Sequence, residues 1–336
     1  MTADSSPSGP PPEAAYFEML AAYWRLLGVR AVADAALADH LKDGPLTADE
    51  LAARAQAQPN AIYRIMRSMT NAGFFEEVAP RTFALTPVGQ LLRSDVPNSF
   101  RSMILSEMGI ERVAAWHNLP YSFRTGKVAW DDAYQGKDVW HWYRENPAQG
   151  EHFAKWMTQG SRVTGQAICK AFDFSAYPTI VDVGGGQGLF LTQILDAFPS
   201  CQGILFDQPQ VVAGAPDVPR LKKVGGDFFE AVPAGADLYT LKWVIHDWDI
   251  PKSVAILGNV RKAMKPGAQL MLIEALVRRG PEADLAKWMD INMMTMTGGE
   301  ERDESEYREL LDRAGFALER TIATDAFPWL LLAKPK

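Results

Sequence analysis

Three ionisable side chains placed at or after predicted strands have the types that proton transfer requires. His246 follows the predicted strand Leu238–Lys242, Glu274 lies in the predicted strand Gln269–Ala275, and Glu301 lies in a glycine-rich loop further along the chain. The carboxyl ends of parallel strands meet at one edge of a sheet, so we expect these groups to lie close together. Imidazole, with an ordinary pKa of about 6.5, can accept a proton, and a carboxylate on its other nitrogen stabilises the imidazolium. The set indicates a general base, with a purely structural histidine as the alternative.

A glycine-rich segment, VDVGGGQG, joins another predicted strand to a predicted helix. Glycines let the backbone turn tightly and approach a ligand with no Cβ in the way. Gly184, Gly186 and Gly188 form the spacing GxGxG, and Leu189 occupies the position of the third glycine in the dinucleotide fingerprint GxGxxG. The spacing favours a nucleoside cofactor without a pyrophosphate, S-adenosylmethionine, over NAD.

Two acidic residues follow the next two predicted strands. Asp207 lies about 20 positions after the glycine loop, where a carboxylate can bind ribose hydroxyls. NAD and S-adenosylmethionine both have a ribose, so Asp207 by itself does not separate them. Asp227 could accept a hydrogen bond from an adenine amino group while Phe228 packs on the ring. The alternative for Asp227 is a helix N-cap.

A base beside such a cofactor site predicts methyl transfer to oxygen. The transfer is an in-line displacement, and the acceptor must lose its proton. A free phenol has a pKa of about 10, so a positioned imidazole that takes the proton assists the attack. Proximity and alignment supply much of the remaining rate.

The elements that must position these residues alternate between strand and helix from Thr179 onward. This alternation predicts an α/β fold, a Rossmann-like doubly wound sheet with ligands at the carboxyl ends of its strands. The predicted strands are Thr179–Val183, Gln202–Phe206, Leu221–Val224, Leu238–Lys242, Gln269–Ala275, Ala317–Ile322 and Trp329–Ala333, and the predicted helices are Leu189–Ala197, Val211–Ala213, Pro251–Ala263 and Ser305–Ala314.

Residues 14–100 have a different pattern, that of an N-terminal helical domain. It predicts helices at Tyr16–Leu27, from a capping box at Thr47, and at Ala61–Ala72, followed by two short strands, Phe74–Val78 and Arg81–Leu85. This order is that of a winged helix, whose third helix can read DNA. Here that helix offers two arginines, Arg64 and Arg67, and acidic residues surround it. Packing or dimerisation is therefore the better interpretation.

Residues 101–172 are predicted to be helical, and they are rich in aromatic side chains. Aromatic residues at helical spacing are most often core residues. Because this segment directly precedes the glycine loop, some of its aromatic residues could line a pocket for a flat substrate. The methyltransferase domain is therefore predicted to span 101–336, with 101–172 as linker and pocket wall.

The composition bounds the class of protein. The chain has 336 residues, 47% hydrophobic and 22% charged, which suits two soluble globular domains. A net charge of -7 argues against a nucleic-acid partner. Two cysteines, with no cluster at zinc spacing, predict a reducing, cytoplasmic compartment and no metal. Residues 1–13 are predicted to be a disordered tail and no stretch is long enough to span a membrane, so no membrane partner is expected.

The chain resembles the small-molecule O-methyltransferases of the plant caffeate and hydroxyindole type and their bacterial relatives in aromatic polyketide and phenazine pathways. The resemblance covers nearly the full length. It is carried by the motifs VDVGGGQG, FDQP, GGDFF, LKWVIHDW, LIEA and GGEERDESEY. It implies an S-adenosylmethionine-dependent enzyme that methylates a hydroxyl of an aromatic small molecule, and a homodimer built by the N-terminal domain.

The resemblance also implies roles for individual residues. His246 matches the general base, and Glu274 and Glu301 flank it. The residues implied to bind the cofactor are Asp182, Gly184, Gly186, Asp207, Gly226, Asp227, Phe228 and, through its backbone, Lys242. The residues implied to bind the substrate are Trp156, Met157, Asp247, Asn292, Met293 and Met296, with ordinary core filling as the alternative for Met157.

Two further functions remain open from the sequence. A relative with the same fold could use the cofactor for N-methylation, decarboxylation or hydroxylation, although such departures often lose the histidine. A metabolite-sensing DNA-binding regulator is the more remote alternative, and the acidic balance counts against it.

Overall fold

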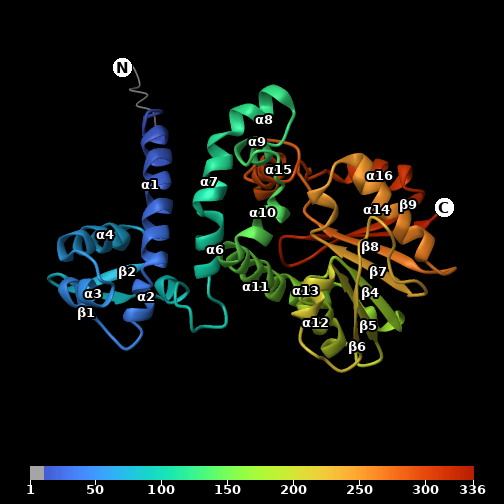
Figure 1. The fold of residues 1–336 in the computed structure, drawn as a ribbon, viewed down its shortest axis with the longest axis horizontal. Coiled ribbons are helices and arrows are strands. Elements are labelled where there is room, and N and C mark those ends of the chain that lie inside the picture. The colour runs from blue at the N-terminus through green and yellow to red at the C-terminus, as the bar shows by residue number, and fades with distance from the viewer. Residues whose placement is uncertain (1–10) are drawn as a thin grey trace, which may run out of the picture. The chain divides into compact units, whose positions relative to one another are not determined.

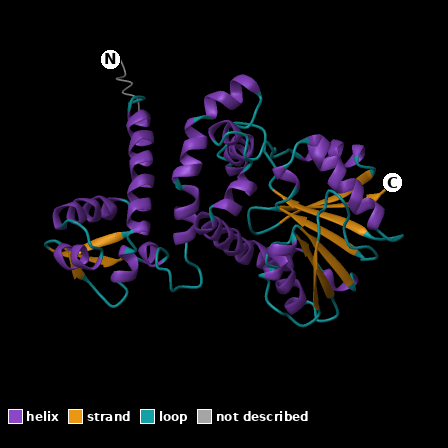
Figure 2. Ribbon diagram, in the orientation of Figure 1, coloured by secondary structure: helices purple, strands orange, loops and turns teal. Residues whose placement is uncertain are grey.

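The computed structural model describes residues 11–336 and divides into two compact units (Figures 1 and 2). One unit contains the residues up to Ile110 together with Ala148–Trp156, and the other contains Glu111–Pro147 and Met157–Lys336. Most of the predicted tail, residues 1–10, lies outside the described residues.

The first unit has the predicted winged-helix order. Its elements are α1 (Ala14–Asp34), α2 (Leu37–His40), β1 (Leu46–Thr47), α3 (Ala48–Arg54), α4 (Pro59–Asn71), β2 (Phe75–Ala79), β3 (Thr82–Leu85), α5 (Pro87–Gln90) and α6 (Arg101–Glu107). The three strands pair in the order β1-β3-β2, all antiparallel. The third strand, β1, was missed by the sequence because two residues are too few to produce an alternating pattern.

Local chemistry explains where these helices begin and end. The Thr47 hydroxyl accepts from the Glu50 N–H at 3.2 Å while the Glu50 carboxylate accepts from the Thr47 N–H at 2.8 Å, which is the predicted capping box. Pro59 is the first residue of α4, where its missing N–H costs nothing. Gly73, at φ +78°, lets the chain leave that helix for β2.

Five helices lie between the winged-helix elements and the sheet in the sequence: α7 (Ile110–His117), α8 (Leu119–Thr125), α9 (Ala129–Ala133), α10 (Val139–Glu145) and α11 (Pro147–Ala171). Two further helices, α13 (Pro209–Ala213) and α15 (Leu285–Met296), follow strands of the sheet. The sequence indicated the first five as a helical stretch but did not predict α15 as a helix. Its apolar residues are spread around the helix, so no amphipathic stripe marks it. Across the described residues 11–336, no helix is long and apolar enough to cross a bilayer.

The second unit is built around the predicted sheet. Its strands are β4 (Thr179–Val183), β5 (Gln202–Asp207), β6 (Leu221–Gly225), β7 (Leu238–Lys242), β8 (Gln269–Glu274), β9 (Phe316–Ala323) and β10 (Trp329–Pro335), in the order β6-β5-β4-β7-β8-β10-β9. The first five are mutually parallel, whereas β10 is antiparallel to both β8 and β9. The order reverses at β4, between β5 and β7, which is the switch point where doubly wound sheets bind ligands.

Helices cover both faces of this sheet. One core contains residues of α14 (Ile250–Ala263) and α16 (Glu304–Arg313) with β7, β8 and β10. The other contains residues of α11 and α12 (Leu189–Ala197) with β4 and β5. Burial on both faces explains why β4, β7 and β8 consist mostly of apolar residues and do not alternate between apolar and polar.

Candidate active site

The candidate site is assembled at the carboxyl edge of the sheet, where β7 ends. Trp243 takes a left-handed backbone conformation, with φ +57°, and turns the chain sharply into the short 3-10 helix η2 (Ile245–Asp247). The Glu274 Oε1 atom accepts from the N–H groups of Val244 and Ile245, at 3.3 and 2.9 Å. The end of β8 therefore holds the segment that carries His246.

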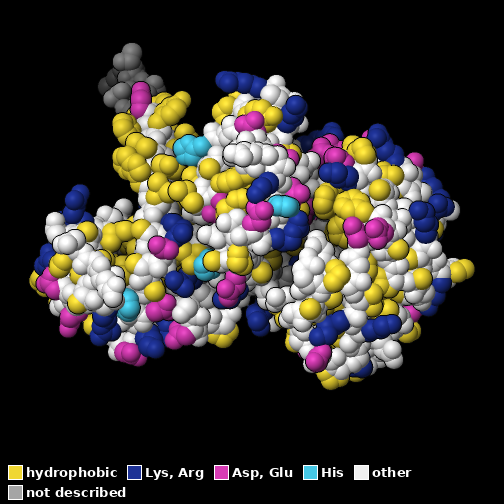
Figure 3. Space-filling view, viewed as in Figure 1, with side chains coloured by type: hydrophobic (Ala, Val, Ile, Leu, Met, Phe, Trp, Pro, Cys, Tyr) yellow, Lys and Arg dark blue, Asp and Glu magenta, His cyan; other side chains and the backbone are white. Residues whose placement is uncertain are grey.

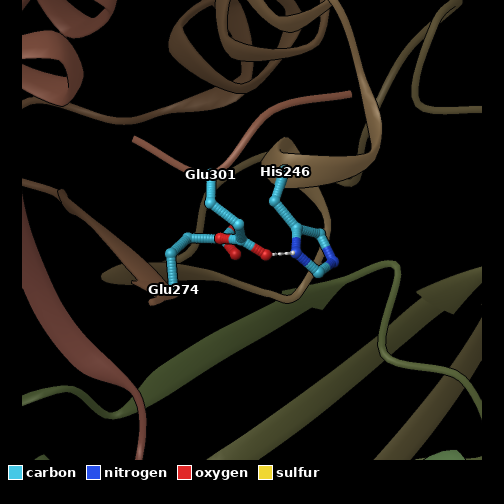
Figure 4. Close-up of side chains that lie close together, drawn as sticks. All are labelled: His246, Glu274 and Glu301. Carbon is cyan, nitrogen blue, oxygen red and sulfur yellow. Dashed lines mark hydrogen bonds and ion pairs between the residues drawn. The ribbon is translucent and has the colours of Figure 1, made fainter. Parts of the chain in front are cut away.

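His246, Glu274 and Glu301 come together as the sequence predicts (Figure 4). All three are buried, and His246 Nδ1 lies 2.6 Å from Glu301 Oε1. One nitrogen or oxygen atom of each residue lies within 4.8 Å of the others. Ligands of a metal bound at about 2.1 Å and at right angles or wider would be about 3 Å or more apart, so the 2.6 Å separation fits a hydrogen bond better.

The electrostatics of this cluster favour a charged imidazole. Burial alone lowers the pKa of His246, but the carboxylates of Glu301, Asp247 and Glu274 outweigh it and raise the pKa to about 10. Burial raises the pKa of Glu274 to about 7 despite the opposing charge of His246. Among the described residues, Glu274 Oε2 and Glu301 Oε2 are buried without a hydrogen-bond partner. A proton held at Glu274 relieves the repulsion between these two carboxylates.

The Asp247 carboxyl group lies on the side of the second ring nitrogen of His246. Its Oδ1 atom lies 3.8 Å from His246 Nε2, beyond hydrogen-bond distance. Burial raises the pKa of Asp247 to about 6, although the charge of His246 lowers it. Nε2 is therefore the ring nitrogen left for an acceptor, with a carboxyl group beside it.

The glycine loop follows β4 with three positive φ angles, +70° at Gly184, +60° at Gly186 and +78° at Gly188. A Cβ at Gly186 would meet nothing within 4 Å, so the loop is open on that side. The Gly186 N–H donates to Asp207 Oδ2 at 2.8 Å, and the Gln208 N–H donates to Oδ1 at 2.7 Å. Asp207 is thus fixed against the loop, and its oxygens keep further lone pairs that can accept hydrogen bonds.

Asp182 lies on β4, and Lys242 lies at the end of β7, the strand that pairs with β4. Asp182 is buried and accepts from the Thr240 hydroxyl at 2.7 Å, and burial raises its pKa to about 6. The partly buried Lys242 ammonium donates to Ser161 Oγ at 2.9 Å, and burial lowers its pKa to about 8. Ser161, on α11, was missed by the sequence analysis because no motif contains it.

The predicted adenine site is an aromatic corner after β6. Phe228, Phe229 and Trp248 pack edge to face, with ring centroids 4.9 to 6.0 Å apart. Asp227 Oδ1 accepts from the Phe229 N–H at 2.8 Å, a local turn contact that leaves Oδ2 without a partner among the described residues. Gly226 lies against the Phe206 ring, where a Cβ would clash. Trp248, which sits in the LKWVIHDW motif, is a member that the sequence analysis did not assign.

The predicted acceptor residues on α15 lie beside a polar cluster. Asn292 Oδ1 accepts from Arg112 Nη2 at 3.3 Å and from Trp116 Nε1 at 3.2 Å, so its amide nitrogen points away from both donors. Met293 and Met296 are buried. Met157, at the start of the α11 portion in this unit, is 39% exposed, whereas Trp156 belongs to the first unit and packs on Phe100 at 6.2 Å. The roles predicted for these residues stay predictions.

Two family models match the chain over most of its length. An O-methyltransferase domain matches residues 116–317, and an O-methyltransferase dimerisation domain matches residues 17–95. The doubly wound sheet, the open glycine loop and these matches define a methyltransferase that uses S-adenosylmethionine. Because the first match covers more than half of the chain, the protein belongs to the O-methyltransferase family and is an S-adenosylmethionine-dependent O-methyltransferase.

Individual relatives match most or all of the chain. The phenazine O-methyltransferase of Lysobacter antibioticus is 33% identical over 344 residues, which cover 100% of both chains. The 8-amino-8-demethylriboflavin N,N-dimethyltransferase of Streptomyces davaonensis is 33% identical over 298 residues, 85% of each chain. An O-methyltransferase of neocarzinostatin biosynthesis, solved with S-adenosylmethionine and 2-hydroxy-5-methyl naphthoic acid, is similar with a TM-score of 0.78 and 29% identity, covering 93% of this chain and 96% of that one.

Proposed function

We propose that this protein methylates a hydroxyl of an aromatic small molecule and that His246 is the general base. The observation that carries the proposal is the buried His246–Glu301 hydrogen bond, 2.6 Å long, at the strand end next to the glycine loop. Glu301 occupies Nδ1, which leaves Nε2 for the acceptor proton.

The raised pKa of His246 matches that of a phenolic acceptor. A phenol has a pKa of about 10, and the pKa of His246 is raised to about 10, so a proton passes between the two with little free-energy difference. His246 Nε2 takes the proton of the acceptor hydroxyl, and Glu301 stabilises the imidazolium that results. Glu274 holds the backbone of the catalytic segment in place through Val244 and Ile245.

S-adenosylmethionine, when bound, supplies a methyl group on a sulfonium. The residues fit its parts: Asp207 would bind the ribose, Asp227 and the ring of Phe228 the adenine, and the glycine loop would let the nucleoside approach the backbone. We further propose that the Lys242 ammonium and the Ser161 hydroxyl bind its carboxylate, because they form a polar pair beside the start of α12, with Lys242 Nζ 6.0 Å from the Phe190 ring centroid.

The acceptor pocket is proposed to lie between α15 and the helices of residues 101–172 in the same unit. Asn292, held by Arg112 and Trp116, would present its amide N–H groups as donors to an oxygen substituent on the acceptor. The buried Met293 and Met296 would offer adaptable apolar contacts to a flat ring. The naphthoic acid bound to a relative is an acceptor-sized ring system of this kind.

Replacing His246 by alanine tests the base. Methyl transfer from labelled cofactor to a panel of aromatic hydroxyl compounds should fall by about 10² to 10⁴. Affinity for S-adenosylhomocysteine, measured by calorimetry, should stay within about twofold because His246 is not among the residues proposed to bind the cofactor. Unchanged turnover in this variant removes His246 from the mechanism.

N-methylation is the second candidate, and the N,N-dimethyltransferase relative is the observation that favours it. An acceptor pair that differs only in an aromatic hydroxyl or amino group separates the two outcomes. Label in the amine and none in the phenol would replace the proposal by the alternative. If neither acceptor is labelled and the product has lost a carboxyl group or gained an oxygen atom, the reaction is decarboxylation or hydroxylation.

We also propose that two copies of the chain associate through the first unit. The dimerisation domain matches this unit, and one side of α1 carries large exposed apolar residues (Figure 3). Tyr16, Phe17, Met19 and Trp24 are 62 to 72% exposed. A contiguous apolar face of this kind on a surface helix marks an association site.

A further inference from the structure

Trp243 has a backbone conformation that its side chain disfavours. Its φ of +57° makes it the one aromatic residue with positive φ among residues 11–336. A glycine would take this conformation without steric cost, whereas for a bulky residue it is an outlier. The Trp243 N–H donates to the Ile273 carbonyl at 3.1 Å, so the sheet holds the strained turn in place. A tryptophan in a position suited to glycine points to a use for its ring.

The Trp243 ring packs against both the predicted base and a second aromatic residue. Its centroid is 5.2 Å from that of His246, at an interplanar angle of 43°. The Trp243 ring also stacks on the Phe327 ring, with centroids 6.0 Å apart and an interplanar angle of 15°. Trp243 and Phe327 are only partly buried, unlike the core residues around them, so filling the core does not account for the stack.

Phe327 is fixed by the loop that joins β9 to β10. Within this loop the Thr324 hydroxyl donates to the Pro328 carbonyl at 2.7 Å and accepts from the Ala326 N–H at 3.1 Å. Pro328, the next residue, is buried. The loop is therefore closed on itself by one side chain, and it presents the Phe327 ring in a defined place.

We propose that Trp243 and Phe327 form a positioning pair for His246. The stack sets the orientation of the Trp243 ring, and this ring limits the tilt of the imidazole, so that Nδ1 stays directed at Glu301 and Nε2 at the acceptor. The pair also covers one side of the imidazole against water, which strengthens the His246–Glu301 interaction. Trp243 and Phe327 act through His246 and touch neither reacting atom. The inference rests on the proposed role of His246 as base.

Three variants separate the parts of this inference. Phe327→Leu removes the stacking partner without changing residue 243. Trp243→Phe keeps a ring, and Trp243→Gly relieves the backbone while it removes the ring. Phe198→Leu is the matched control, because Phe198 makes an aromatic contact with Phe174 at the end of α12 and has no part in the site.

The first readout is the nitrogen-15 spectrum of the histidine side chains in the complex with S-adenosylhomocysteine, with His246→Ala used to assign the His246 signals among five histidines. Phe327→Leu and Trp243→Gly should broaden or shift the two ring nitrogens of His246, whereas Trp243→Phe should leave them near their original positions. This readout needs no turnover, so it stands even if the reaction proves to be a different one.

The second readout is the pH dependence of turnover. Phe327→Leu and Trp243→Gly should lower kcat by about tenfold or more, since small misplacement of a reacting group is costly, and should displace the pH profile. The KM for the cofactor and the affinity for S-adenosylhomocysteine should be unchanged, and Trp243→Phe should restore most of kcat. An unchanged His246 spectrum with an unchanged pH profile in Phe327→Leu and Trp243→Gly overturns the positioning role. Wild-type turnover in His246→Ala overturns the proposed role of His246 as base. In that case the nitrogen-15 spectra still show whether Trp243 and Phe327 position the His246 ring.

Discussion

The hydrogen bond between His246 and Glu301 sets the pH at which the proposed base works. With a pKa raised to about 10, the imidazole is mostly charged at neutral pH, and its neutral fraction grows about tenfold for each pH unit up to that value. For an acceptor whose hydroxyl stays protonated, kcat/KM should therefore rise steeply between about pH 7 and 9.

Glu301→Gln should change the shape of this profile as well as its height. Removal of the Glu301 carboxylate takes away the largest influence that raises the pKa of His246, while Asp247 and Glu274 remain, so the rise in rate should move to lower pH and the rate should depend less on pH above neutrality. Activity should also fall, by about 10²-fold, because the imidazole loses its orienting partner. Glu306→Gln, on the exposed start of α16, is the control. A steep pH dependence that persists in Glu301→Gln contradicts the assignment of the rise to His246.

Lys242 makes a second prediction at this scale, for the cofactor. Because burial lowers the pKa of Lys242 to about 8, the charged ammonium is lost as the pH rises through that value, and affinity for S-adenosylhomocysteine should weaken there. Lys242→Met should weaken binding by about 10- to 100-fold and remove this pH dependence, and Ser161→Ala should cost less. An analogue without the carboxylate should bind wild type and Lys242→Met equally. If Lys242→Met weakens binding of the analogue as much as binding of S-adenosylhomocysteine, Lys242 supports the fold through Asp182 rather than binding the carboxylate.

Among the elements, the loop that brings Glu301 to His246 packs directly on the segment that carries His246. A Cβ at Gly299 would overlap the His246 carbonyl oxygen and the backbone of Asp247, and the Glu300 N–H donates to that same carbonyl at 2.8 Å. Gly299→Ala should push the loop from the catalytic segment and lower kcat at least about tenfold. Gly298→Ala is the control: it strains a residue at φ +76° but meets Val128 rather than the catalytic backbone. Equal losses in the two variants would attribute the effect to general destabilisation.

The elements differ in how well the sequence predicts them. The bounds of β4, β7 and α12 are confirmed to the residue, because fully buried strands and the glycine loop leave sharp changes of composition. The helix α15 and the two-residue strand β1 were missed, since neither produces a periodic pattern. The same holds for the candidate site. The residues at strand ends were predicted from the sequence, whereas Ser161 on α11 and Phe327 in the β9–β10 loop belong to no sequence motif and were not.

For the whole molecule, the apolar side of α1 predicts how the chain assembles. Placing aspartate at Phe17 and Trp24, which are 71% and 62% exposed, should convert a dimer to a monomer in light scattering at micromolar concentration. These side chains leave solvent only on association, so the melting temperature of the monomer unit should change little. Glu18→Gln on the same helix is the control. Monomeric wild-type protein, or a dimer that survives both substitutions, would contradict the proposed interface.

The sequence by itself determined the class of this protein, because the chemistry of a nucleoside site is local: a strand, a glycine spacing and an acid after each of the next strands follow one another along the chain. Only the tertiary structure decided what surrounds the base. The 2.6 Å contact joins residues 55 positions apart, the raised pKa of His246 depends on carboxylates from three segments, and the stack on Trp243 is supplied by a loop more than 80 positions away. Charge and ring contacts act through space, and no pattern along the chain records the distances at which they act.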